Sequence, residues 1–472
     1  MTGATGYGRA RSTVRTVGAA LMVSVLTSAP ALAITPPAVD PSVPPPSGAP
    51  GPVAAMEQRG DCVRSDVLPG SDFSAATAAQ RMLDLPAAWQ FSRGEGQTVA
   101  VIDTGVRPGP RLGAVDAGGD YIGTTDGLTD CDGHGTLVAG IVAGQPGTDG
   151  FTGVAPAARV VSLRVASASV SPRPVGDDPR AARVTTEIAA LSRAIVHAAD
   201  LGARVITIPI SSCLPADRDI DQTALGAALR YAAVEKDALV VAAAGDTGQA
   251  GSMGGEQACE SNPLTDPSRP QDPRNWAAVT SLSVPSWWHP YVLSVASLSS
   301  DGQPSGFTMA GPWVGVAAPG ESVVSVSNRD DGGLANALPG NQGKLVALSG
   351  TGYAAGYVAG VAALVRSHYP ELTAMQVAHR MVATAHNSAR APSDMVGAGI
   401  IDPVAALTWE LSAAPDLDSS PVKKISPPAA APRQDPAPRV VALAGTALLA
   451  GLVVAVATGA AAAARRRKES QQ

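Results

Sequence analysis

Cysteine is scarce in this chain, and no two cysteines form a CxxC pair. A zinc site built from paired thiolates is therefore not expected. An excess of basic residues is also missing, because the formal net charge is -6, and this argues against a nucleic-acid-binding protein. No internal repeat is present either, so the long middle of the chain is interpreted as one large domain.

The first 33 residues have the pattern of a secretory signal peptide. Arg9, Arg11 and Arg15 precede an apolar stretch at residues 17–26, and the Ala-Leu-Ala sequence at 31–33 is a small-x-small cleavage site. The mature chain is therefore expected to start at Ile34. An uncleaved membrane anchor is the alternative, which is disfavoured because the apolar stretch is too short to span a bilayer.

A second apolar segment, residues 440–464, contains no charged residue. As a helix it would be roughly 37 Å long, enough for a hydrocarbon core of about 30 Å. Four cations follow at once, Arg465, Arg466, Arg467 and Lys468, and by the positive-inside rule they hold the tail in the cytoplasm. We expect a single-pass cell-membrane protein whose main domain is extracytoplasmic. An alanine-rich low-complexity tail is the alternative, and the leucine and valine residues of the segment argue against it.

The cysteine count agrees with export. Cys62, Cys131, Cys213 and Cys259 are an even number of cysteines in a chain that is expected to leave the cytoplasm. This suggests two disulfide bonds. Four cysteines allow three pairings, and their spacing alone does not choose among them.

Two proline-rich stretches, residues 34–53 and 412–439, bracket the middle of the chain. Such stretches cannot bury enough apolar surface to fold alone and act as semi-stiff spacers. The predicted organisation is a signal peptide at 1–33, a proline-rich extension at 34–75, a folded domain at 76–411, a proline-rich linker at 412–439, a transmembrane helix at 440–464 and a cytoplasmic tail at 465–472.

The folded domain alternates between strand-like and helix-like segments. Apolar runs rich in β-branched residues occupy positions 98–103, 159–165, 203–209, 238–244 and 292–297. Runs of this kind are typical of strands buried on both faces. An α/β fold is therefore predicted, with a mostly parallel central sheet and helices on both sides. In such sheets the functional site lies at the carboxyl ends of the strands, where Asp103, Pro209 and Asp246 fall.

One helix is predicted directly before the strand at 203–209. Its apolar face is formed by Ile188, Leu191, Ile195 and Ala198. Thr185 or Thr186 is expected to cap its start, and Gly202 to stop it.

Three segments carry candidate chemistry. Asp103 ends a strand in the sequence Val-Ile-Asp-Thr-Gly-Val, where an acid can orient a histidine and stabilise its charged form. His134 lies between two glycines at the start of an apolar run that predicts a helix. The sequence Ser-Gly-Thr-Gly-Tyr-Ala-Ala-Gly, residues 349–356, is a glycine turn leading into a helix of small residues.

In this order the segments resemble the subtilisin superfamily of serine proteases, whose motifs are D-T/S-G, H-G-T and G-T-S-x-A-x-P. The resemblance covers residues 81–407 and includes the Gly-Val-Ala-Pro sequence at 153–156 and residues 316–320. It implies a subtilisin-like three-layer domain. A structural calcium is common in the superfamily, but no acidic cluster suggests ligands for it here, so no metal or other cofactor is expected.

The candidate site departs from the superfamily pattern at three positions. Gly352 stands at the position of the nucleophilic serine, Gly356 at that of the following proline, and Asp246 at that of the asparagine that donates to the oxyanion. Glycine offers no nucleophile, and an ionised carboxylate repels an oxyanion instead of donating to it. The leading interpretation is a pseudoprotease that retains Asp103 and His134.

Two other interpretations stay open. An active serine-type endopeptidase would need an unusual nucleophile, and the hydroxyls considered for that role are those of Ser349, Thr351, Ser211 and Ser212. A peptide-binding module that uses the cleft without cutting ranks last. The reason is that Gly356 changes the cleft, and that Thr207 and Pro209 replace the asparagine and serine that are usual in the segment lining it.

A narrower resemblance is to the mycosins, the membrane-anchored subtilases of actinobacterial type VII secretion systems. The order of signal peptide, proline-rich extension, four cysteines, linker and membrane helix carries it, together with residues 192–208 and the Ser-Ser-Cys sequence that ends at Cys213. It implies the disulfides Cys62–Cys131 and Cys213–Cys259, and an extension that wraps the domain without being removed. The implied partner is the secretion complex in the inner membrane, where a scaffold role requires no peptide hydrolysis. A peptide or protein client is the other partner considered.

Overall fold

The computed structural model describes residues 34–173, 178–248, 259–264, 266, 268–269, 271–340, 343–389 and 392–411, together with residues 448, 452 and 459. The predicted signal peptide, linker and cytoplasmic tail lie outside these residues. Of the predicted membrane helix, only residues 448, 452 and 459 are described. Within the described residues, no helix combines the length and the apolar character needed to cross a membrane.

A nine-stranded sheet forms the centre of the described domain, with the strand order β16-β17-β11-β10-β8-β6-β2-β4-β3. Neighbouring strands run parallel except for the antiparallel pair β16–β17 at one edge. The strands are β2 (Thr98–Asp103), β3 (Val115–Asp120), β4 (Arg159–Arg164), β6 (Val205–Ile208), β8 (Leu239–Ala243), β10 (Val292–Leu298), β11 (Val314–Pro319), β16 (His386–Asn387) and β17 (Gly399–Ile400). All five strands predicted from the sequence are confirmed within one or two residues.

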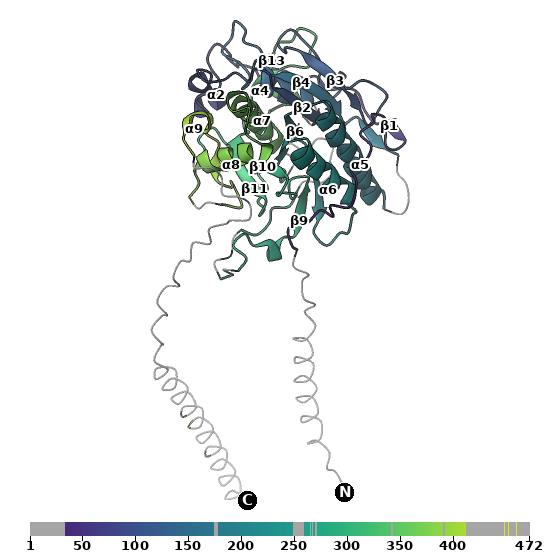
Figure 1. The fold of residues 1–472 in the computed structure, drawn as a ribbon, viewed down its shortest axis with the longest axis vertical. Coiled ribbons are helices and arrows are strands. Elements are labelled where there is room, and N and C mark those ends of the chain that lie inside the picture. The colour runs from purple at the N-terminus through teal and green to yellow at the C-terminus, as the bar shows by residue number, and fades with distance from the viewer. Residues whose placement is uncertain are drawn as a thin grey trace, which may run out of the picture. The chain divides into compact units, whose positions relative to one another are not determined.

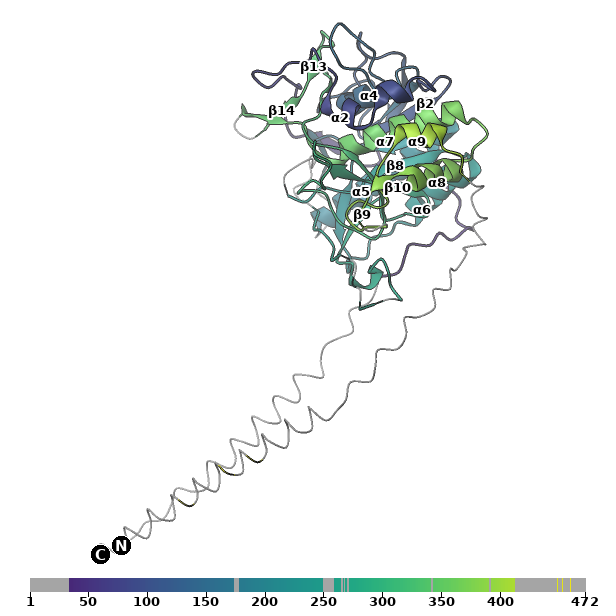
Figure 2. The same cartoon turned by 90° about the vertical axis from the view of Figure 1, so that its left-hand side faces the viewer.

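Both faces of the sheet are covered, which makes a three-layer domain (Figures 1 and 2). Val99 and Val101 of β2 belong to one apolar core, and Ala100 and Ile102 to the other. This alternation follows from the period of two residues along a strand. The helices of the first core are α2 (Ala78–Met82), α3 (Leu85–Ala88), α4 (His134–Ala143), α7 (Thr351–His368), α8 (Ala374–Thr384) and α9 (Pro403–Thr408), and those of the second are α5 (Pro179–Asp200) and α6 (Thr223–Arg230).

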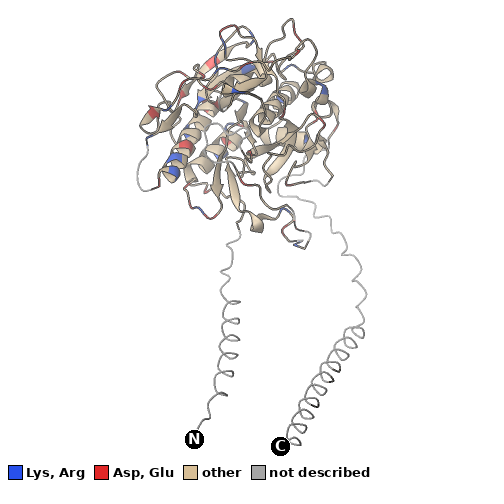
Figure 3. Cartoon of the chain, turned by 180° about the vertical axis from the view of Figure 1, so that it is seen from behind, with Lys and Arg blue, Asp and Glu red and all other residues tan. Residues whose placement is uncertain are grey.

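Helix α5 starts earlier than the sequence suggested. The prediction of a cap at Thr185 or Thr186 is wrong, because Asp178 caps the helix by accepting the backbone N–H of Ala181 at 3.0 Å. Proline in the first turn suits this start, since its fixed φ is already helical. The predicted stop at Gly202 is confirmed by its left-handed φ of +78° directly after the C-cap. Figure 3 shows basic and acidic positions along this helix, where Arg183 and Glu187 form an ion pair of 2.8 Å.

Four two-stranded sheets and two short helical turns lie outside the central sheet in the described residues. The antiparallel pairs are β1 (Met56–Gln58) with β5 (Val170–Pro172), β7 (Ser212–Pro215) with β9 (Ser281–Val284), β12 (Ser325–Val326) with β13 (Leu334–Ala335), and β14 (Ala337–Pro339) with β15 (Leu345–Ala347). A π-helical turn, Tyr231–Glu235, extends α6, and a 3₁₀ turn spans Trp276–Ala278.

The proline-rich extension is bound along the domain by its own backbone. Gly51 donates its N–H to the carbonyl of Asp120 at 2.8 Å, and β1 then pairs with β5. Farther along, Val63 donates to the carbonyl of Cys131 at 2.7 Å. The extension therefore wraps the sheet edge at β3 and reaches the loop that carries His134.

Candidate active site

Asp103 and His134 meet at the carboxyl end of the sheet. Asp103 ends β2, and His134 is the first residue of α4. Nδ1 of His134 lies 2.8 Å from one carboxylate oxygen of Asp103 and 3.0 Å from the other, and both side chains are buried. Burial alone would lower the pKa of His134, but the charge and hydrogen bond of Asp103, with smaller contributions from Asp130 and Asp246, raise it.

Backbone conformation and steric limits explain the two glycines beside His134. Gly133 adopts a left-handed φ of +82°, which costs glycine little. A Cβ atom on Gly135 would collide with the carbonyl oxygen of Gly105, in the turn that follows Asp103. The two segments can approach closely enough for the imidazole to reach the carboxylate because residue 135 has no side chain.

Asp130, which is not among the site residues predicted from the sequence, organises both segments. Its carboxylate accepts hydrogen bonds from the hydroxyl of Thr104 at 2.9 Å, the N–H of Gly133 at 2.8 Å, and the N–H and hydroxyl of Thr136 at 2.9 and 2.5 Å. Burial raises its pKa to about 6, although the Thr136 hydrogen bonds oppose the shift. An aspartate followed by Cys-Asp-Gly is the turn-forming signal that could have identified it.

Gly352 faces the imidazole from the first turn of α7. A Cβ atom at this position would lie 3.1 Å from both Nε2 and Cε1 of His134. The space is already taken on another side, because the carbonyl oxygen of Pro209 would be in steric overlap with the same Cβ atom. Gly352 thus lies where the resemblance places a nucleophile, but the carbonyl oxygen of Pro209 occupies the space that its side chain would need.

Asp246 follows β8 and lies at the start of α7. One of its carboxylate oxygens accepts the N–H of Thr351 at 2.9 Å, while the hydroxyl of Thr351 accepts the N–H of Gly245 at 3.2 Å. Burial raises the pKa of Asp246 to about 7, against the lowering effect of the Thr351 hydrogen bonds and of His134. A carboxylate therefore occupies the N-terminus of the helix, where a developing oxyanion would otherwise gain from the helix dipole.

Tyr353 completes the enclosure and was also not foreseen. Its ring packs against the imidazole of His134, with ring centroids 4.9 Å apart and planes tilted by 46°. Burial is the main reason that the pKa of its phenol is raised, and the nearby charges of Asp103, Asp246 and Asp130 add to it.

None of the hydroxyls considered as replacement nucleophiles is hydrogen-bonded to the imidazole of His134. The hydroxyl of Ser212 donates to Glu187 at 2.8 Å, that of Thr351 accepts from Gly245, and Ser211 is exposed. Ser349 is half-buried, and among the described residues no hydroxyl is hydrogen-bonded to His134. Thr207, on the neighbouring strand, has a buried hydroxyl without a partner in the described part of the chain.

Sequence comparison assigns the family. The subtilase family profile, Peptidase S8, matches residues 94–399. Mycosin-3 of Mycobacterium tuberculosis strain H37Rv is 63% identical over 444 residues, which cover 94% of this chain and 96% of that protein. The chain belongs to the mycosins, within the subtilase family.

Solved mycosin structures share the fold. A structure of MycP3 protease from the type VII (ESX-3) secretion system matches with a TM-score of 0.76 and 62% identity, covering 80% of this chain and 100% of that one. A chain in a structure of an intact ESX-5 inner membrane complex matches with a TM-score of 0.78 and 45% identity, covering 90% of this chain and 100% of that one. The sequence-based assignment to the mycosins is confirmed.

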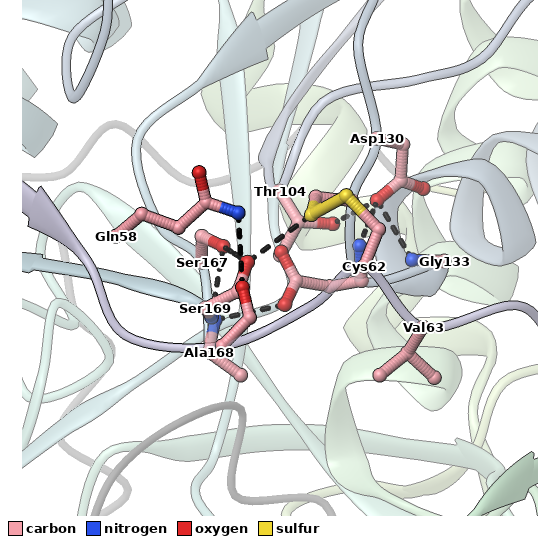
Figure 4. The surroundings of a disulfide bond; sticks show 12 residues. Gln58, Cys62, Val63, Thr104, Asp130, Gly133, Ser167, Ala168 and Ser169 are labelled. Carbon is pink, nitrogen blue, oxygen red and sulfur yellow. Dashed lines mark hydrogen bonds between the residues drawn. A yellow bond between two sulfur atoms is a disulfide. The ribbon is translucent and has the colours of Figure 1, made fainter.

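Both disulfides that the mycosin resemblance implied are confirmed, as Cys62–Cys131 and Cys213–Cys259. Cys131 stands between Asp130 and Asp132, so the first disulfide fastens the extension beside the His134 loop (Figure 4). The hydroxyl of Ser169 lies 3.1 Å from the sulfur of Cys131, and the carboxylate of Asp132 accepts the N–H of Ala168 at 2.8 Å. In the described residues, no group of three or more His, Cys, Asp or Glu side chains is arranged to hold a metal ion.

Proposed function

We propose that this mycosin is a pseudoprotease that acts as an extracytoplasmic scaffold in a type VII secretion membrane complex. The observation that carries the proposal is the combination of Gly352 with the Pro209 carbonyl beside it, because together they leave neither a nucleophile nor room for one.

The chemistry of the site supports loss of hydrolysis. In a related protease, removal of the nucleophile costs about 2 × 10⁶-fold in turnover and leaves about 10³- to 10⁴-fold over water, from the oxyanion hole and substrate binding. Asp246 weakens this remainder, since a carboxylate can donate to an oxyanion only when it is protonated. The retained pair Asp103–His134 has no proton to remove from residue 352.

The scaffold role rests on similarity to assembled relatives. The ESX-5 inner membrane complex contains a chain that matches 90% of this one, and a second solved structure of similar chains is described as the periplasmic assembly of that complex. A signal peptide at 1–33 and a membrane helix at 440–464 would place the folded domain on the same side of the membrane. Removal of residues 440–472 should release the chain from the membrane fraction, whereas removal of residues 465–472 should not.

An activity assay on residues 34–411 tests the pseudoprotease. The native chain should neither cleave a broad peptide library nor react with a serine-directed fluorophosphonate. Two repaired variants should be compared with it, Gly352→Ser with Asp246→Asn, and the same pair with Pro209→Ser, which releases the fixed φ of residue 209. Fluorophosphonate labelling of either repaired variant would locate the loss of catalysis at these positions.

An active endopeptidase with an unusual nucleophile is the alternative, and the intact Asp103–His134 hydrogen bond is the observation that favours it. Hydrolysis by the native chain that His134→Ala abolishes would establish this alternative. Complementation separates the two in the cell. A deletion strain rescued equally by the native chain and by His134→Ala supports the scaffold, and rescue that fails with His134→Ala contradicts it.

A further inference from the structure

Three buried carboxylates act on one imidazole: Asp103 is hydrogen-bonded to His134, and Asp130 and Asp246 interact with it through their charges. Asp103, Asp130, Asp246 and His134 are each less than 10% exposed. The carboxylates come from the end of β2, the loop before α4 and the turn after β8. A single imidazolium can balance one of them, and burying like charges together is costly unless protons are taken up. Burial of the cluster therefore favours proton uptake by its carboxylates.

The same four residues connect two helix starts. His134 opens α4, and Asp130 also holds the backbone N–H of Thr136 in its first turn. Asp246 holds the backbone N–H of Thr351, the first residue of α7, and the ring of Tyr353 lies against His134. A change in the charge of this cluster acts on both helix N-termini at once.

We propose that this cluster is a proton-operated latch, which joins the N-termini of α4 and α7 and holds most tightly at mildly acidic pH. The proposal concerns conformation and does not depend on whether the chain hydrolyses peptides.

The direction of the effect follows from proton uptake. The pKa values of Asp130 and Asp246 lie at about 6 and about 7 in the folded protein, chiefly because of burial, and that of His134 is also raised. The folded chain thus binds more protons than the unfolded chain between about pH 4 and pH 7, so the unfolding equilibrium constant falls as the pH falls through these values. The stabilisation is complete below the ordinary carboxylate pKa and is lost as the pH rises through the folded values.

The other ionisable groups around the imidazole do not reverse this direction. Asp132, from the loop before α4, has a raised pKa because of burial, with the charge of Arg164 from β4 acting against the shift. Tyr353, from α7, keeps its phenol proton because burial raises its pKa. Asp103, from β2, faces the imidazole directly, with an oxygen 2.8 Å from Nδ1 of His134.

Thermal and denaturant unfolding of the full-length chain in detergent, measured from pH 8 to pH 5, tests the latch. The unfolding equilibrium constant should fall by about tenfold or more over this range for the native chain, one pKa unit being worth a factor of ten. Asp246→Asn keeps an oxygen for the N–H of Thr351 but cannot take up a proton, so its fall should be clearly smaller. Asp61→Asn, at an exposed carboxylate, is the matched control and should follow the native curve.

Equal pH dependence in the native chain and in Asp246→Asn would overturn the proposal, as would a native chain that is less stable at pH 5 than at pH 8. Hydrogen exchange on the native chain gives a readout that needs no variant. After correction for intrinsic rates, the amides of residues 351–356 and 134–138 should be better protected at pH 5 than at pH 8. Protection that is equal at the two values, or lower at pH 5, contradicts the latch.

Discussion

The carbonyl oxygen of Pro209 occupies the space that a Cβ atom on Gly352 would need. In the catalytic pattern of this superfamily, that Cβ atom carries the nucleophile beside Nε2 of the histidine. The two positions lie on different elements, at the end of β6 and at the start of α7. The position of the Pro209 carbonyl therefore depends on the absence of a side chain at residue 352.

Gly352→Ala is expected to destabilise the domain by about 1–3 kcal/mol, because the added methyl group overpacks the contact with Pro209 and His134. Denaturant unfolding measures the change. The control is Gly306→Ala, since an added Cβ at that exposed position meets no atom within 4 Å. Equal stability of the two variants would show that the segment at 209 moves aside freely, and that a serine at 352 would fit without further repair.

The positions of the candidate residues could be predicted from the sequence, but the closure of the site could not. Asp103 and Asp246 follow apolar runs, and the carboxyl ends of parallel strands meet at one edge, so their proximity follows from topology. The place of the Pro209 carbonyl depends on how β6 packs beside α7, which no local pattern reports. Tyr353 likewise falls within a predicted helix of small residues, and a single sequence does not reveal which helix face meets the imidazole.

The start of α5 illustrates the same limit on a smaller scale. Two threonines ahead of an apolar stripe are a reasonable cap signal, yet the helix continues two turns before them from Asp178 and Pro179. Those turns carry few buried residues, so no hydrophobic periodicity indicates a helix there. Cap chemistry, an aspartate followed by proline, was the informative signal.

Asp130→Ala should cost about 3 kcal/mol or more, because it leaves the buried hydroxyl of Thr104 and the N–H groups of Gly133 and Thr136 without an acceptor. It should also disorder the loop that positions His134. Denaturant unfolding and the NMR signals of the His134 ring provide the measurements. Asp61→Ala is the control at an exposed carboxylate, and a loss no larger than in that control would show that Asp130 does not organise the site.

Removing the disulfide that fastens the extension should lower the stability of the domain and expose the extension to protease. Cys62→Ser with Cys131→Ser opens a cross-link between residues 69 positions apart, at an expected cost of about 2–4 kcal/mol. Limited proteolysis should then cut the extension near residue 62 sooner than in the native chain. The double variant Cys213→Ser with Cys259→Ser is the control, because that cross-link does not involve the extension. Similar cutting of the extension in both double variants would rule out a specific fastening role.

Asn328 provides the second attachment of the extension, and it also contacts the loop that carries His134. Its buried amide accepts from the N–H of Ser65 at 2.9 Å and donates to the carbonyls of Val63 at 3.0 Å and Asp130 at 3.4 Å. Asn328→Ala should therefore lower the free energy of unfolding by about 2–3 kcal/mol, since it leaves several buried backbone groups unpaired.

The same variant should speed proteolysis of residues 60–70 even while the Cys62–Cys131 disulfide stays intact, because the disulfide holds Cys62 and the amide holds the backbone that follows it, at Val63 and Ser65. Gln303→Ala, at an exposed side chain, is the control. If Asn328→Ala and the disulfide double variant are combined, the loss in the free energy of unfolding should be smaller than the sum of the two separate losses, because both act on one attachment near Asp130. Strict additivity would mean that the extension is held at two independent points and that the His134 loop does not couple them.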